Sequence, residues 1–391
     1  MGALFEKMAT GWGFAAALVR GWRTPEKIVV IESDDWGAIR TASREAYERL
    51  LAAGYAMDRS CYSLDALETS EDLDLLFEVL ESVRDGAGRP ACVTANMIMA
   101  NPDFERIRRG RFREYFYEPV SATLSRLPGR AEVTARWAQG ARRRAFVPQL
   151  HAREHVRWWE WLSALRDGWP EAVTAFEMGM CGVPMAASKT RRSFFDCLYL
   201  ADDELQRQDV DLEAMITEGA GLFEKQFGHK ALSVMAPNYC WTDTVEQIWG
   251  RLGVRYIQGM PCQYVGSTKR RRFHYLGQRG TGGGYYLVRN GRLEPSRFGP
   301  RSVQRCLREV ARAFRFHRPA IICSHRVNYI GSIEPRNRAE GLRQLKALLE
   351  AICRRWPEVR FLSSPELGGV LEGRQQGIEG PLPQRPGARR G

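Results

Sequence analysis

Short apolar runs that read as buried strands alternate along this chain with amphipathic helical patterns. The strand candidates are KIVVIES (27–33), ACVTANMIM (91–99), AFVPQL (145–150), EAVTAFE (171–177), ALSVMAP (231–237), VRYIQG (254–259), AIICSH (320–325) and VRFLSS (359–364). Between several of them lie helical segments with apolar spacings of three and four, at 69–86, 302–317 and 338–356. Because such alternation builds βα units, the chain is predicted to be α/β, a distorted (β/α) barrel of about seven strands with extra helices.

One section, 272–296, departs from this alternation. Its Asn290-Gly291 dipeptide is flanked by β-forming residues, which predicts an inserted β-hairpin. The TGGG run at 281–284 could cradle a phosphate, but no strand leads into it and no helix follows it directly. A flexible turn is therefore the preferred interpretation of that run.

The domain organisation is predicted to be a helical lead-in at 1–24, the barrel with its insertions at 25–368, and a disordered tail at 369–391. The tail is rich in Gly, Pro, Gln and Arg and has no periodic apolar face. The run WGFAAALV (12–19) is followed by RGWRTPEK rather than by a small-residue cleavage site, which favours a helix over a signal peptide. No apolar run reaches the roughly 18 residues that a membrane span needs.

Charge and cysteine content restrict the partners and the compartment. The chain has 58 Lys+Arg against 46 Asp+Glu, a net charge of +12, which favours an anionic partner. Much of the excess lies in short runs at 106–113, 141–144, 189–192 and 269–273, typical of loops that attract an acidic glycan or a phosphorylated ligand; nucleic acid is the alternative. Nine cysteines without CxxC pairs indicate a reducing compartment, with the cytoplasm as the default.

Polar residues that end the apolar runs are the candidates for function, because a parallel barrel places its site at the carboxyl ends of its strands. Four such ends occur. The first is Asp34-Asp35, the second is HAREHV (151–156), the third is APNYCW (236–241), and the last is His325.

His151 and His155 form the most specific of these patterns. A spacing of four at a helix start would place both imidazoles on one face, within reach of one metal ion. Two histidines that cap and pack a helix start are an ordinary alternative. A strand-end carboxylate as a third ligand would favour metal binding, since catalytic zinc sites have three protein ligands and one open position.

The order SDDWG, HAREH, APNY and CSH resembles the motifs of polysaccharide deacetylases of the NodB-homology class, carbohydrate esterase family four. The likeness covers about residues 27 to 330, and Asp-Asp with H-x₃-H is its specific part. The resemblance implies that Asp34 is the general base and His325 the general acid. It also implies that Asp35, His151 and His155 hold one divalent ion, with zinc favoured.

This resemblance implies removal of an acetyl group, N-acetyl favoured, from an amino sugar of a glycan or glycan precursor, possible substrates including lipid-linked or nucleotide-linked ones. A metal-activated water would attack, and a backbone N–H near Asn238 would help to hold the oxyanion. Candidate substrate or oxyanion contacts are Asn238, Tyr239, Trp36, Trp241 and Arg153. Trp158 and Trp159 are interpreted mainly as core residues.

The chain also departs from the family pattern. Met235 stands where the third motif has an arginine, so the partner that orients the base is missing; Arg153, Arg326 and Arg40 are possible substitutes. Gln258 lies where an acidic fourth motif is expected. These departures keep two alternatives open, a glycan-binding barrel without catalysis and a different metal-dependent hydrolase on the same fold. A basic nucleic-acid-binding protein is a third, for which strand-end acids would be a handicap.

Overall fold

The computed structural model describes residues 20–195, 210–266 and 270–373. The helix expected at 12–19 and residues 374–391 of the tail expected at 369–391 lie outside these residues. The predicted start of the tail is too early, because residues 369–371 form the end of a helix, Ser364–Leu371. Within them, no helix has both the length and the apolar character that crossing a membrane requires.

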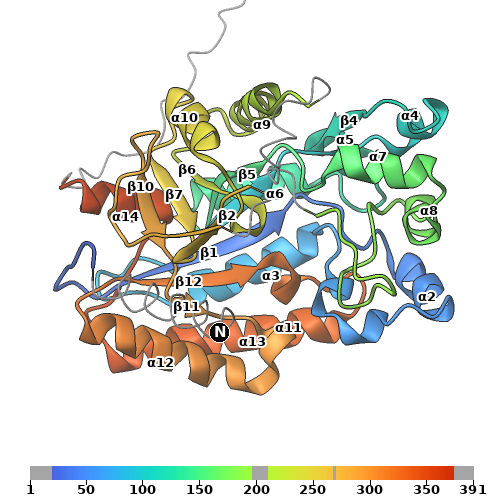
Figure 1. Ribbon diagram of the computed structural model, residues 1–391. Helices are drawn as coiled ribbons and strands as arrows, with labels where there is room; N and C mark the ends of the chain where they lie inside the picture. Colours follow the sequence, from blue (N-terminus) through green and yellow to red (C-terminus); the bar gives the residue numbers. More distant parts are fainter. Residues whose placement is uncertain (1–19, 196–209, 267–269, 374–391) are drawn as a thin grey trace, which may run out of the picture.

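A curled parallel sheet flanked by helices forms the centre of the molecule (Figure 1). Its strands follow the order β10-β7-β6-β5-β2-β1-β12-β11, with β13 paired to β1, and every pairing is parallel. The strands are β1 (Ile28–Trp36), β2 (Val93–Ile98), β5 (Phe146–Ala152), β6 (Ser233–Met235), β7 (Tyr256–Gly259), β10 (Tyr285–Val288), β11 (Gly291–Arg292), β12 (Ala320–His325) and β13 (Arg360–Phe361). The predicted distorted barrel is confirmed, with eight strands along this path instead of seven.

The predicted hairpin at Asn290-Gly291 is wrong. Strands β10 and β11 do not pair with each other: β10 lies parallel to β7, and β11 lies parallel to β12. Only Arg289 and Asn290 separate them, so the segment 285–292 bridges β7 and β12, which are the two ends of the six other strands along this path. The inserted hairpin lies earlier, where β8 (Cys262–Tyr264) pairs antiparallel with β9 (Arg271–Phe273).

The described helices cover the outer side of the sheet and its carboxyl-end loops (Figure 1). They are α2 (Arg44–Ala52), α3 (Ser70–Ser82), α4 (Phe104–Arg109), α5 (Val120–Arg126), α6 (Val133–Arg142), α7 (Trp158–Arg166), α8 (Pro170–Glu177), α9 (Leu212–Phe227), α10 (Asp243–Arg251), α11 (Pro295–Phe298), α12 (Ser302–Arg315), α13 (Pro335–Arg355) and α14 (Ser364–Leu371). A short antiparallel pair, β3 (Ala100–Pro102) with β4 (Tyr117–Pro119), lies beyond β2.

Capping residues and apolar spacing in the sequence explain helix α3, and they also explain why the strand predicted at 171–177 is wrong. Helix α3 begins as predicted, because Thr69 and Asp72 form a capping box. The segment 171–177, expected to be a strand, is helix α8. Pro170 occupies its first turn, where a missing N–H costs nothing, and Ala172, Ala175 and Phe176 form its buried face.

Strand β1 divides the core into an outer and an inner part. Val29 and Ile31 pack in the large cluster that contains residues of α3, α6, α12 and α13. Ile28 and Val30, on the other face of the strand, pack with residues of β7, β10, β12 and α14. Because side chains alternate along a strand, Glu32 and Asp34 continue the inner face toward the carboxyl end. The apolar filling of the barrel therefore ends in two buried carboxylates.

Candidate active site

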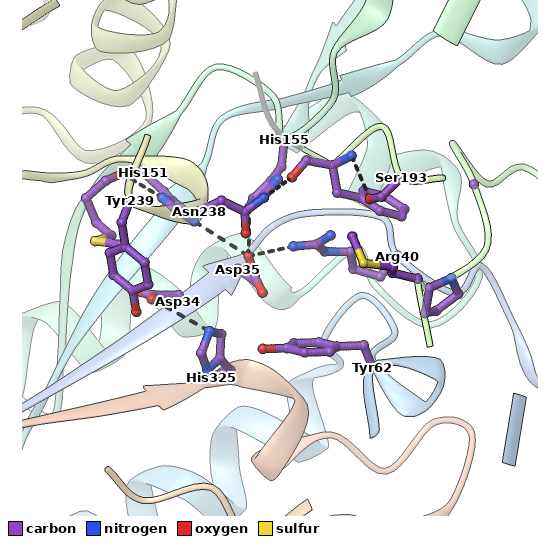
Figure 2. A pocket seen from close by; sticks show the side chains of 15 residues that line it. Asp34, Asp35, Arg40, Tyr62, His151, His155, Ser193, Asn238, Tyr239 and His325 are labelled. Atoms are coloured by element: carbon purple, nitrogen blue, oxygen red, sulfur yellow. Dashed lines mark hydrogen bonds and ion pairs between the residues drawn. The ribbon is translucent and has the colours of Figure 1, made fainter. Parts of the chain in front are cut away.

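A β-bulge at the end of β1 explains how two adjacent carboxylates serve one site. Between Ser33 and Trp36 the register with β2 shifts, so that Asp34 and Asp35 together oppose a single residue of β2. Asp35 adopts a left-handed backbone with φ of 75°, a conformation uncommon outside glycine. In a regular strand the two side chains would point to opposite faces; with this bulge both line one cavity of about 230 Å³ (Figure 2).

Asp35, His151 and His155 converge in this cavity. The Nε2 atoms of both histidines lie 3.5 Å from Oδ1 of Asp35, and all three side chains are buried. The expected helical placement of the histidines is wrong: His151 belongs to β5, and His155 lies in the loop between β5 and α7. The chain turns between the two residues, and this turn, in place of a helix, brings both imidazoles to the same side of Asp35.

The donor set of these three residues fits a divalent metal ion. Nδ1 of His151 is 2.7 Å from the carbonyl oxygen of Met235, which fixes a proton on that nitrogen and leaves the Nε2 lone pair facing Asp35. Burial, together with Arg40, lowers the pKa of His155 well below its usual value, so its imidazole is neutral as a ligand must be. Burial acts to raise the pKa of Asp35, but Arg40 and the two histidines lower it well below its usual range.

Asp34 is held by a different group of partners. Arg289 donates to both of its oxygens, from Nη1 to Oδ2 at 2.7 Å and from Nη2 to Oδ1 at 2.8 Å. Asn96 donates a further hydrogen bond of 2.7 Å to Oδ1, and Gln258 accepts from the same amide. Burial raises the pKa of Asp34, but the Arg289 guanidinium outweighs it and leaves the pKa below its usual value. Asp34 is therefore an ionised, rigidly oriented carboxylate.

His325, at the end of β12, lies on the other side of Asp34. Its Nδ1 is 2.6 Å from Oε1 of Glu294, and its Nε2 is 3.9 Å from Oδ2 of Asp34. Burial acts to lower the pKa of His325, but Glu294 and its hydrogen bond raise it well above the usual value. The ring of Tyr62 packs edge-on against the imidazole at 5.7 Å between centroids (Figure 2). The Glu294 carboxylate therefore favours the protonated form of this imidazole.

Asn238 and Tyr239 line the cavity as the sequence predicts. Both have left-handed φ, of 51° and 58°, in the short turn after β6. In this turn the N–H groups of Tyr239 and Cys240 donate to the carbonyls of Ala236 and Pro237, while the N–H of Asn238 has no backbone partner among the described residues. The hydroxyl of Tyr239 accepts from Nη1 of Arg289 at 3.2 Å, so this ring also supports the guanidinium that holds Asp34.

Three predicted contact residues lie away from the cavity. The bulge places Trp36 on the same face as Ser33, to which it donates a 3.0 Å hydrogen bond, and its ring packs against Phe146 in the outer core. Trp241 is also fully buried, with its Nε1 donating to Glu246. Arg153 pairs with Glu154 and Glu218.

Sequence reasoning missed the two residues that hold Asp34 and His325. The proposed substitutes for the absent arginine are engaged elsewhere: Arg326 with Asp65 and Glu68, and Arg40 with Asp35. Arg289 takes that role, and Glu294 takes the role of the missing acid. Both follow short strands, β10 and β11, so the strand-end signal was present but was interpreted as a hairpin turn.

Comparisons with known proteins give likenesses among solved structures alone. No family model matches the chain, and no curated protein matches it. A protein assigned as a polysaccharide deacetylase from Mycobacterium smegmatis is similar at 10% identity and a TM-score of 0.45, over 94% of this chain and 97% of that chain. A protein assigned as a glycoside hydrolase/deacetylase from Parabacteroides distasonis is similar at 9% identity and a TM-score of 0.48, over 90% and 72%.

A further similar structure is that of a CE4 family pseudoenzyme from Bacillus anthracis, at 10% identity and a TM-score of 0.36, over 88% of this chain and 66% of that chain. At such values the chemistry has to be derived from this chain's own side chains. The chain is thus similar, at low identity, to polysaccharide deacetylases, the family that its motifs resemble.

Proposed function

We propose that this protein is a metal-dependent hydrolase that removes an acetyl group, in preference N-linked, from an amino sugar of a glycan or glycan precursor. The observation that carries the proposal is the meeting, in one cavity, of a metal-type donor set with an ionised carboxylate and a protonated imidazole. Asp35, His151 and His155 supply the first, and Asp34 and His325 supply the second. Acyl transfer to water requires these roles together.

One divalent ion, zinc in preference, held by Asp35, His151 and His155 would supply Lewis-acid chemistry that activates water near neutral pH. Asp34 accepts the proton of the attacking water, since Arg289 keeps it ionised and fixes its direction. The N–H of Asn238 donates to the carbonyl oxygen as negative charge develops there.

His325 then protonates the departing amine. Its Nδ1–H is engaged by Glu294, so Nε2, which faces Asp34, carries the proton that is transferred. The amide C–N bond breaks, acetate retains the oxygen of the water, and the free amine leaves with the proton from His325. Glu294 holds the imidazole in this orientation.

The remainder of the glycan has space beside the active-site cavity. A second cavity of about 970 Å³ shares Tyr62 and Met185 with it. Four arginines, Arg44, Arg59, Arg191 and Arg297, line this second cavity together with three acids, Glu48, Asp58 and Glu334. This excess of positive charge supports an acidic or diphosphate-bearing substrate, and activity that falls steeply with added salt is expected, whereas indifference to salt would contradict it.

Other features of the chain bear on the compartment and on the alternatives. The eight described cysteines are free thiols, which supports a cytoplasmic location.

A glycan-binding barrel without catalysis was favoured by the missing arginine and acid. Arg289 and Glu294 fill both roles from other positions, so that argument loses its basis.

Metal content and acetate release test the proposal together. Wild-type protein is expected to carry about one divalent ion per chain by plasma mass spectrometry, on the donor-set argument above, and to release acetate from N-acetylated amino sugars. His151→Ala/His155→Ala is expected to lose both properties. His229→Ala, a change at an exposed histidine, is the matched control and should keep both. Absence of metal from reconstituted wild type would overturn the proposal; metal without acetate release from any acetylated sugar would favour the binding protein.

A further inference from the structure

A second arginine-rich cavity is lined by residues of the β10–β11 segment and of helix α12. Helix α12 packs beneath the sheet (Figure 1). The cavity has a volume of about 300 Å³ and shares no lining residue with the active-site cavity. Five arginines line it, Arg289, Arg292, Arg305, Arg312 and Arg318. The guanidinium of Arg289 is directed to the inner face of the same segment, where it pairs with Asp34 and Glu32.

Arg318 is the key residue of this cavity. It is only 4% exposed, and its Nη1 donates to the carbonyl of Trp22 at 3.0 Å. Its Nε and Nη2 are buried and have no hydrogen-bond partner among the described residues. A buried guanidinium with two unsatisfied donors is costly, because the nitrogens have lost water and received nothing in exchange.

No neighbouring carboxylate among the described residues balances the positive charge of Arg318. Glu309 is the acidic side chain of the cavity wall, and both of its oxygens are occupied, by Nε of Arg305 at 3.2 Å and by the backbone N–H of Arg292 at 2.8 Å. Within the described residues, no carboxylate forms an ion pair with Arg292, Arg312 or Arg318. Burial and the neighbouring Arg23 lower the pKa of Arg318, as expected for a cation in a positive surrounding. The cavity thus carries an unbalanced positive charge.

We propose that this cavity binds the phosphate group, mono- or diphosphate, of a small organic molecule. Guanidinium groups match phosphate oxygens in geometry and charge, and Arg318 offers two nitrogens for them. The volume exceeds the need of a lone phosphate, and Leu276, Val288 and Pro261 form an apolar wall for an attached organic group. The site includes none of Asp34, Asp35, His151, His155 and His325, and Arg289, which also lines it, has its guanidinium engaged by Asp34 and Glu32.

Isothermal titration of the full-length protein with inorganic pyrophosphate, at constant ionic strength, tests this site. Wild type is expected to bind one pyrophosphate saturably. Arg318→Gln and Arg312→Gln should each weaken binding about tenfold or more, as loss of a charge-assisted contact does. Arg308→Gln is the matched control, because Arg308 is an exposed arginine of the same helix that does not line the cavity.

The exposed position of Arg312 keeps the test valid if Arg318→Gln fails to fold. Vesicles of phosphatidic acid in phosphatidylcholine form a second arm: binding that needs Arg312 and Arg318 there, with weak affinity for pyrophosphate, would assign the phosphate to a lipid headgroup. No saturable binding in either arm would overturn the proposal. Equal weakening by Arg308→Gln would do the same, because it would mean attraction to net charge alone.

Discussion

Asp34 and Asp35 are consecutive residues at the end of β1, yet their surroundings differ in kind. Asp34 receives hydrogen bonds on both oxygens, from Arg289 and Asn96, and its position is fully determined by protein groups. Asp35 shares its Oδ1 with Arg40 and with two imidazoles that approach no closer than 3.5 Å. Asp34 is satisfied by hydrogen bonds from protein groups. Asp35 belongs to a cluster of potential metal ligands, together with His151 and His155, whose ligand atoms face one another.

This difference shows how a fold assigns two roles to one residue type. Arg289 neutralises Asp34 in a fixed geometry, which suits a proton acceptor that must stay ionised and correctly directed. The Asp35 group presents lone pairs to a common point, which suits a cation. The bulge with its left-handed residue is what separates the two environments over a single peptide unit.

The largest effect on activity is expected from substituting Asp34 and Asp35 one at a time by asparagine. Asp35→Asn should abolish both bound metal and acetate release, because it removes the anionic ligand. Asp34→Asn should keep the metal, while the rate falls by about 10²- to 10⁴-fold, as for loss of a general base. Metal analysis and initial rates on both variants check this. Loss of metal from Asp34→Asn would mean that the two carboxylates act as one ligand group.

Removal of Arg289 should lower the free energy of unfolding more than removal of an exposed arginine does. Arg289→Met leaves Asp34 and Glu32 buried without their partner, which is expected to cost about 3–5 kcal/mol in the free energy of unfolding. Arg109→Met, which removes an exposed pair with Glu105, should cost less than about 1 kcal/mol. Urea unfolding of both variants measures the difference; similar values for the two would show that Asp34 does not depend on this arginine for its charge.

Two histidines, the buried His274 and the partly buried His325, allow the comparison to be extended to the pH dependence of stability. Burial lowers the pKa of His274 to about 4, so it stays neutral in the fold. The unfolded chain takes up this proton near its ordinary pKa of about 6.5, so stability is lost as pH falls, by about 2 kcal/mol between pH 7 and 5. His325, with its raised pKa, contributes in the opposite direction: its stabilisation is present at low pH and is lost as pH rises through its folded pKa.

Urea unfolding at several pH values checks the His274 contribution. His274→Gln should unfold with a smaller loss of stability on acidification than wild type, whereas His229→Gln, at an exposed site, should follow wild type. An unchanged acid dependence in His274→Gln would contradict a buried neutral imidazole at this position.

The smallest effect on activity is expected from substituting Glu294, the hydrogen-bond partner of His325. Glu294→Gln removes the carboxylate that raises the pKa of His325, so the pKa moves down toward the ordinary value. Because the proposed mechanism uses the protonated form of His325, the alkaline fall in rate should begin at lower pH, with a loss of about tenfold or less near neutrality. A pH–rate profile measures this, and a uniform loss at every pH would assign Glu294 a purely structural role.

Much of the candidate site could be predicted because its residues follow long, distinct apolar runs. The end of β1 and the end of β12 were recognisable from sequence, and the parallel pairing of these strands brings Asp34 beside His325. Arg289 was not found, because β10 and β11 are short and Asn290-Gly291 is typical of a hairpin turn. Trp36 was misplaced because the bulge, which no local pattern indicates, reverses the face to which it points.

The segment 285–292 connects architecture to reactivity. Its first half pairs with β7, its second half pairs with β12, and Arg289 between them holds the base. The pairing of this segment with both strands therefore also places Arg289 against Asp34. A change that separated the segment from β7 or β12 would be expected to remove this guanidinium from Asp34 and, on the proposed mechanism, to lower acetate release as well as stability.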